Sequence, residues 1–189
     1  MVVALSTVHL PAADRFRELG YLCPVPVLSP SEVARCREAL GALDRALGPR
    51  NRFQQSHIYL RWAFDLVTHP AVVEAVAGVL GNDVAAWGSL ILTKPPDRES
   101  FVPWHQDGAY RPTLKTGGAL TAWIALTESR AIHGCLRVVP GSHHTVLPHR
   151  PTHDPNSLLE RGQEVAPGLT EAIGEDQAVD LELHAGEMS

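Results

Sequence analysis

Near Asp83 the spacing of apolar residues changes, and this change limits the fold more than any other feature of the chain. Before it, apolar residues recur every three or four positions, the period of an amphipathic helix. After it, apolar and polar residues alternate, the period of a strand. Helices followed by strands exclude a parallel doubly wound sheet and favour an antiparallel jelly roll with a helical layer. We therefore predict one domain over 1–189, with a mainly helical layer over 1–82 and a jelly-roll core over 83–189.

Helix signals are concentrated in the first part of the chain. Ser29, as N-cap, and Glu32 are predicted to form a capping box around Pro30, which begins a helix that ends before Gly48. Further helices are predicted over 12–19, 57–67 and 70–80.

Five strands are predicted in the second part, from apolar runs and alternations bounded by turn-forming residues. They cover 84–94, 101–107, 120–126, 135–139 and 179–184. The segment between 142 and 177 is rich in His, Pro, Gly, Asn and Asp and has weak periodicity. We predict a long excursion there with one short helix, the kind of loop that often forms a functional lid.

Composition excludes several classes of partner. The net charge of -5, from 16 basic and 21 acidic residues without a basic cluster, argues against nucleic acid or an anionic membrane surface. Three scattered cysteines (Cys23, Cys36 and Cys135) predict reduced thiols, and the short apolar N-terminus lacks the basic region of a signal peptide. We expect a cytoplasmic protein whose partner is a small-molecule substrate, with the oligomeric state left open.

The chemistry is concentrated in Trp104–Asp107. His105 and Asp107 stand two residues apart after an extended segment, and residues i and i+2 of a strand project to one side. A histidine and a carboxylate that converge in this way make two-thirds of the 2-His-1-carboxylate ligand set of non-haem Fe(II) oxygenases. An isolated His-x-Asp is more often structural, so the surrounding residues decide its meaning.

Those surrounding residues resemble the phytanoyl-CoA dioxygenase family. The matching motifs follow one another in order from about Gly20 to the last residue: 92–96, 102–107, 121–126, 133–136, 139–143 and 179–189. The resemblance implies a double-stranded β-helix, a jelly-roll core that uses Fe(II), with 2-oxoglutarate and O2 as cosubstrates.

On this resemblance, His105 and Asp107 are the first two iron ligands. Gln106 and Trp123 match positions that border the 2-oxoglutarate site, and Lys94 matches a lysine common in bacterial members. A core tryptophan is the alternative interpretation of Trp123.

Two departures from the family pattern stand out. His133 occupies a position where the family usually has an asparagine. The distal histidine and the arginine that holds the far carboxylate of 2-oxoglutarate have no candidate, and the resemblance places them beyond Ser189. We therefore expect a jelly roll that is incomplete at its C-terminus and a chain that is inactive by itself.

The other histidines leave alternatives open. A group in the 142–177 excursion indicates either a loop at the rim of the site or a second metal, although its spacing matches no zinc pattern; its members are His143, His144, His149 and His153. His184 is either a residue on the polar face of a strand or a replacement iron ligand, and His57 either packs or points into a substrate cleft.

The sequence thus predicts an Fe(II)- and 2-oxoglutarate-dependent dioxygenase that hydroxylates a small organic substrate. A non-catalytic jelly-roll binding module is the alternative from another class, because a third ligand is missing. A halogenase is a weaker alternative, since such enzymes replace the carboxylate with a small residue and Asp107 is present.

Overall fold

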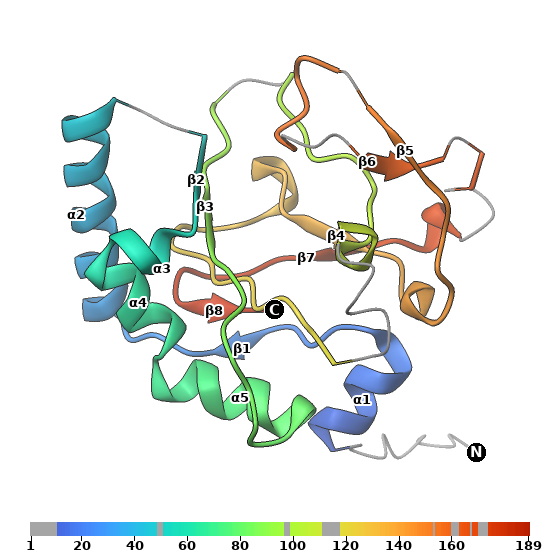
Figure 1. Cartoon of the computed structure of the whole chain (residues 1–189), viewed down its shortest axis with the longest axis horizontal. Coiled ribbons are helices and arrows are strands. Elements are labelled where there is room, and N and C mark those ends of the chain that lie inside the picture. The colour runs from blue at the N-terminus through green and yellow to red at the C-terminus, as the bar shows by residue number, and fades with distance from the viewer. Residues whose placement is uncertain are drawn as a thin grey trace, which may run out of the picture.

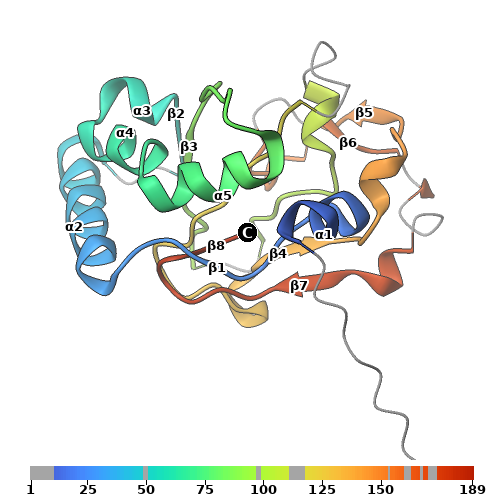
Figure 2. The same ribbon diagram turned by 90° about the horizontal axis from the view of Figure 1, so that it is seen from below.

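The structure is a computed structural model, and it describes residues 11–48, 51–96, 99–110, 118–152, 154–159, 163–166, 168–169 and 174–189. Figure 1 shows α2, α3 and α4 on the left of the molecule, α5 and α1 along its lower edge, and the later strands across its middle and upper right. Seen from below, in Figure 2, helices α2 to α5 form a layer over the layer that contains β1, β8, β4 and β7.

Among the described residues after Asp83, Leu169 alone is α-helical. The α-helices whose bounds are described lie before Asp83, as the apolar spacing predicts. They are α1 (Ala12–Leu19), α2 (Pro30–Leu47), α3 (Ser56–Tyr59), α4 (Arg61–Val67) and α5 (Pro70–Leu80). The predicted capping box is confirmed, because Ser29 Oγ accepts from Glu32 N at 3.4 Å and Glu32 Oε2 accepts from Ser29 N at 2.8 Å.

The predicted helix over 57–67 is wrong in its continuity. Two helices occupy the region, and Leu60 between them has an extended backbone with φ -123° and ψ 116°. The hydroxyls of Ser56 and Ser89 are hydrogen bonded at 2.8 Å, so α3 is fixed to a distant part of the chain. A contact of this kind has no signature in local periodicity.

The described strands form four antiparallel pairs. β1 (Val25–Pro26) pairs with β8 (Glu187–Met188), and β2 (Arg52–Gln54) pairs with β3 (Leu90–Leu92). β4 (Leu136–Val138) pairs with β7 (Val179–Leu181), and β5 (His149–Pro151) pairs with β6 (Gln163–Val165). A continuous eight-stranded jelly roll is therefore not visible within the described residues.

Backbone hydrogen bonds join several of these pairs into a wider ladder around the last residues. Gly186 O accepts from Val27 N and Leu28 N, and Gly186 N donates to Ala125 O at 2.7 Å. Trp123 and Ser189 exchange two backbone bonds of 2.9 and 3.0 Å. The final segment consequently lies between β1 and the segment around 121–129.

The hydrophobic core covers this ladder. Val27 from the chain after β1, Val72 from α5 and Met188 from β8 form a buried cluster. Burial of an aliphatic side chain of this size stabilises a fold by about 1.5–3 kcal/mol. The apolar face of α5 thus attaches the helical layer to the ladder.

Three predicted strands are wrong in extent. Of 120–126, Ile124 forms an isolated bridge to Met188. Of 84–94, only Leu90–Leu92 is a strand, because only these residues face β2. Of 101–107, Phe101 forms an isolated bridge to Ser157, and the chain turns into the 3-10 helix η1 (Asp107–Tyr110). A strand requires a partner, which alternation alone does not supply.

Short elements complete the chain. Besides η1, the described 3-10 helices are η3 (Ala131–His133), η4 (Ser142–His144) and η5 (Glu175–Gln177). The described part of the 142–177 excursion therefore carries η4 and η5 together with β5 and β6. No single described helix is long and apolar enough to cross a membrane, and only α4 and α5 together, bent by 41° at their break, reach that length and composition.

Candidate metal centre

The segment that carries the His-x-Asp pair runs beside the 142–177 excursion. Phe101 N donates to Asn156 O at 3.1 Å, and Val165 N donates to Trp104 O at 2.8 Å. The indole N–H of Trp104 also donates to Glu175 Oε1 at 2.8 Å. Residues 101–104 are thereby fixed before the chain turns at Asp107.

The orientation of the His105 ring is set by its own chain. Nδ1 lies 2.8 Å from Pro103 O, and because a carbonyl only accepts, Nδ1 is the donor. Nε2 is then the nitrogen that faces Asp107, with its Oδ1 at 3.3 Å. The structure thus brings together the two atoms that would bind one metal ion.

The Asp107 carboxylate is oriented by Thr121, whose hydroxyl donates to Oδ2. Oδ1 is therefore the oxygen that faces His105. The two side chains differ in exposure, since that of His105 is 20% exposed and that of Asp107 is 62% exposed. This places the pair at the boundary between protein and solvent, where a small molecule can reach it.

The pKa of His105 reflects the same neighbours. Burial lowers the pKa, but the hydrogen bonds with Asp107 and with Pro103 O and the charge of Asp107 outweigh burial, so the pKa is raised above its ordinary value. The Asp107 carboxylate stabilises the positive charge of protonated His105, and it would likewise stabilise a divalent cation at the same place.

Sequence reasoning missed the contacts that Thr121 and His149 make with this segment. Thr121 begins one of the family motifs, so its position was noted but its partner was not. His149 Nε2 accepts a 2.9 Å hydrogen bond from Gln106 N, between the two proposed ligands. Spacing could not reveal this contact because 43 residues separate its members.

Lys94 and Trp123 are held at other points. Lys94 Nζ donates to Gly134 O at 2.6 Å, and the backbone of Trp123 pairs with Ser189. A cavity of about 100 Å³ adjoins His105 and Gln106, and its walls also include Trp104, Arg137, Val138, Val139, Ser142, Leu147 and Val165. Neither Lys94 nor Trp123 is part of that described wall, so their proposed roles stay predictions.

The histidines of the excursion do not form a second metal site within the described residues. His143 Nε2 donates to Arg17 O at 2.9 Å, and the rings of His143 and His144 are tilted by 38° with centroids 3.9 Å apart. His153 lies outside the described residues. In the part of the chain that the structure describes, no three His, Cys, Asp or Glu side chains gather as a metal-binding group.

His184 and His57 also have other neighbours. His184 Nδ1 lies 3.2 Å from Glu128 Oε1 and 3.0 Å from an Arg130 nitrogen. The described residues thus give no support to His184 as a replacement ligand. His57 Nδ1 lies 2.7 Å from Ser89 Oγ, in the network that fixes α3.

Comparison with solved structures defines the class to which this fold belongs. The chain superposes over 94% of its length on the non-haem monooxygenase ThoJ in its apo form, with a TM-score of 0.69, 32% identity and 66% of that chain covered. A nickel complex of ThoJ aligns similarly, with a TM-score of 0.67, 30% identity and coverage of 94% of this chain and 65% of that one. The fold is therefore that of a non-haem oxygenase.

The family follows from the sequence. The profile described as Phytanoyl-CoA dioxygenase (PhyH) matches residues 16–188, so the chain belongs to this family, which confirms the resemblance. A probable phytanoyl-CoA dioxygenase of Caenorhabditis elegans is 36% identical over 93 residues, 46% of this chain and 30% of the relative. A probable alpha-ketoglutarate-dependent hypophosphite dioxygenase of Stutzerimonas stutzeri is 30% identical over 126 residues, 67% of this chain and 41% of the relative. The chain thus spans less than half the length of these curated relatives.

Proposed function

We propose that the chain functions in an Fe(II)- and 2-oxoglutarate-dependent dioxygenase that hydroxylates a small organic substrate. The observation that carries the proposal is the approach of His105 Nε2 and Asp107 Oδ1 to 3.3 Å. Each of the two is held from behind, His105 by Pro103 O and Asp107 by the Thr121 hydroxyl. Such outer hydrogen bonds fix the tautomer and the orientation of metal ligands.

The donor set fits an octahedral divalent metal. Two ligand atoms that are each about 2.1 Å from such a metal and 90° apart are about 3.0 Å from one another. The observed 3.3 Å between the nitrogen and the oxygen is within a few tenths of that separation. One imidazole and one carboxylate are also the ligand types of the facial triad.

When bound, Fe(II) would supply the reaction of O2 with 2-oxoglutarate and substrate that yields succinate, CO2 and the hydroxylated product. His105 and Asp107 would hold the metal on one side and leave adjacent positions open. By the family resemblance, Lys94 and Trp123 are proposed to flank 2-oxoglutarate. The ladder around Gly186 is proposed to belong to a double-stranded β-helix, and the protein is proposed to be cytoplasmic.

The described residues supply two protein ligands, and the third is proposed to be a histidine outside them. Two ligands alone hold a metal weakly, so we propose that His105 and Asp107 without that histidine turn over little 2-oxoglutarate. Because the chain spans 30% and 41% of the lengths of the two relatives, the activity of the whole protein is part of this proposal.

Calorimetric titration with 2-oxoglutarate tests the proposal. The chain is titrated without metal and in excess Mn2+, which replaces Fe(II) without reacting with O2. Heat of binding is expected only with metal, and His105→Ala should abolish it while His144→Ala, at an exposed loop histidine, should retain it. Binding of 2-oxoglutarate that is equal with and without metal would contradict the proposal.

A non-catalytic binding module is the second candidate. It is favoured by the finding that no group of three metal-ligating side chains exists among the described residues. Such a module has no need of the His105–Asp107 pair, so its ligand binding would be unchanged in His105→Ala. The same titration therefore separates the two candidates.

A further inference from the structure

Gln106, the residue between the two proposed ligands, directs its carboxamide to the loop 142–147. Nε2 donates to Thr145 O at 2.8 Å and to Ser142 O at 3.2 Å, while Oε1 accepts from Leu147 N at 2.9 Å. These three bonds use both amide hydrogens and one acceptor lone pair. The Gln106 side chain therefore holds the loop.

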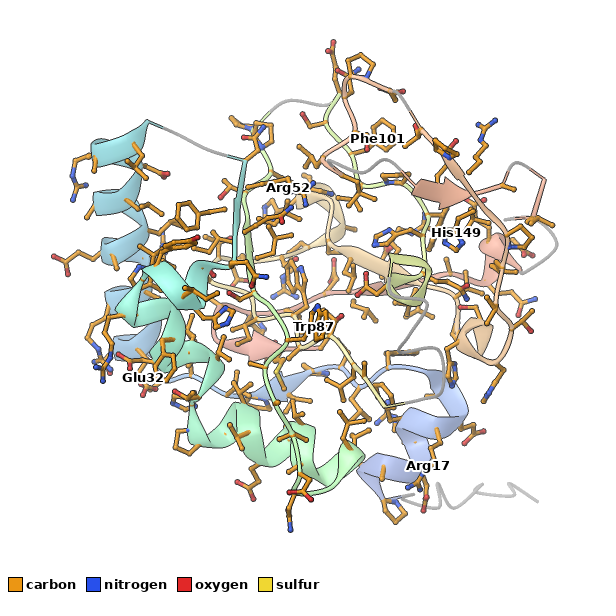
Figure 3. The ribbon with its side chains drawn as sticks, viewed as in Figure 1. Arg17, Glu32, Arg52, Trp87, Phe101 and His149 are labelled. Atoms are coloured by element: carbon orange, nitrogen blue, oxygen red, sulfur yellow. The ribbon has the colours of Figure 1, made fainter. Side chains whose placement is uncertain are left out.

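The same loop returns a bond to the Gln106 backbone. His149 Nε2 accepts from Gln106 N at 2.9 Å, and His149 Nδ1 donates to Leu147 O at 2.8 Å. Because Nε2 must carry a lone pair to accept from N–H, His149 is in its neutral Nδ1–H tautomer. The half-buried His149 side chain, labelled in Figure 3, reaches from β5 toward the turn at η1.

These contacts form a closed set. The Gln106 side chain fixes Leu147 N, Leu147 O fixes the His149 ring, and the His149 ring fixes the Gln106 backbone. The backbone orientation at position 106 determines the angle between the side chains on either side of it. A bond to Gln106 N thus acts on His105 and Asp107 together.

We infer that His149 and Gln106 are positioning residues, which hold His105 and Asp107 in the orientation that binds metal although neither provides a ligand atom. The inference rests on the proposed function only for the identity of the two ligands. Preorganised ligands bind more tightly because less conformational freedom is lost on binding. Outer residues of metal sites commonly contribute about 10- to 100-fold in affinity.

Hydrogen exchange in the metal-free protein tests the closed set of contacts independently of any metal. His149→Phe keeps a planar ring but removes the acceptor, so the Gln106 amide should exchange about tenfold faster or more. His149→Gln can present Oε1 near the position of Nε2 and should restore part of the protection. His144→Phe, at an exposed histidine of the same loop, is the matched control and should leave the Gln106 amide unchanged.

Co2+ titration then tests the connection to metal binding. His149→Phe and Gln106→Ala should each weaken Co2+ binding about tenfold or more, and His149→Gln less. The double variant should lose little more than the worse single variant, because both changes open the same closed set. Circular dichroism establishes that the variants are folded, and His149→Gln provides the measurement if His149→Phe fails to fold.

Two results would overturn the inference. One is wild-type protection of the Gln106 amide in a folded His149→Phe variant. The other is unchanged Co2+ affinity in folded His149→Phe and Gln106→Ala, with a loss of 2-oxoglutarate affinity confined to Gln106→Ala, which would make Gln106 a cosubstrate contact. If the wild-type chain bound no Co2+, the proposed function would fail, and the metal-binding part of the inference would fail with it. Hydrogen exchange would still decide whether the closed set of contacts exists.

Discussion

Thr121 donates its hydroxyl hydrogen to Asp107 Oδ2, which leaves Oδ1 as the oxygen 3.3 Å from His105 Nε2. The hydroxyl therefore selects which carboxylate oxygen faces His105, the oxygen that is proposed to bind a metal. Thr121 reaches Asp107 across 14 residues, from the segment that also carries Trp123.

Thr121→Val is expected to weaken Co2+ binding by about 10- to 100-fold, because valine has the shape of threonine without its donor. Thr121→Ser keeps the hydroxyl and should retain most of the affinity. Thr127→Val, at an exposed threonine of the same segment, is the control, and titration calorimetry is the measurement. Equal affinity in Thr121→Val and wild type would show that the hydroxyl has no influence on the site.

Glu32 provides a prediction about pH and folding. Its pKa is lowered from 4.5 to about 2, first by the hydrogen bond from the Ser29 hydroxyl, then by the Ser29 backbone N–H and by His69. A lowered pKa in the folded state contributes stability above the ordinary pKa, and this contribution is lost as the pH falls through the folded value. Figure 3 shows Glu32 at the start of α2, where the capping box lies.

Glu32→Gln should consequently lower Tm at neutral pH, and the difference from wild type should shrink as the pH falls from about 4.5 toward about 2. Thermal unfolding followed by circular dichroism measures it. Glu38→Gln, at an exposed position of the same helix, serves as the control. A difference in Tm that grows on acidification would contradict the assigned sign.

Gly186 is the glycine at the centre of the ladder, with φ +96°. A Cβ there would lie 2.7 Å from Leu28 O and 3.1 Å from Val33 Cγ2, so backbone strain and crowding would add. Gly186→Ala is expected to reduce the free energy of unfolding by about 2–4 kcal/mol.

Gly78→Ala is the matched control for Gly186→Ala. An added Cβ at Gly78, inside α5, would meet no atom within 4 Å, and alanine should stabilise the helix by about 1 kcal/mol or less. Urea denaturation of both variants is the measurement. Similar free energies of unfolding in Gly186→Ala and Gly78→Ala would contradict the close approach of Gly186 to Leu28 in the ladder.

The local features of this fold could be predicted from sequence, and the contacts between distant segments could not. The capping box of Ser29 and Glu32 joins residues three apart, so their side-chain chemistry alone determines it. The extent of β3 depends instead on β2, which precedes it by about forty residues. Alternation within 84–94 contains no information about that partner.

The candidate site divides in the same way. His105 and Asp107 are recognisable because they stand two residues apart and belong to a motif, although a turn at Asp107 and not a regular strand brings their side chains together. Thr121 and His149 act on that motif through contacts across 14 and 43 residues. Only the folded chain shows that a loop histidine bonds to the backbone between the two proposed ligands.

A further prediction is that the 189 residues alone turn over little 2-oxoglutarate. With Fe(II), ascorbate, 2-oxoglutarate and O2, succinate release should be small, because two protein ligands hold the metal weakly and the third ligand is proposed to lie outside the described residues. The assay is chromatographic detection of succinate, with His105→Ala in parallel. Robust release that depends on His105 would place a third ligand within the 189 residues, and His9 and His153, which lie outside the described residues, would be the first candidates for substitution.

The most direct test is a Co2+ titration of the wild-type chain and of Asp107→Ala. Calorimetry measures the affinity, and visible absorption records the spectrum of the bound metal. Asp180→Ala, which removes the carboxylate that pairs with Arg137 at 2.9 Å, is the control for loss of an acidic residue. If His105 and Asp107 form the metal centre, wild type and Asp180→Ala bind one Co2+, and Asp107→Ala binds it at least about 100-fold more weakly. Equal affinity and an identical absorption spectrum in wild type and Asp107→Ala would contradict the assignment of this pair as a metal site.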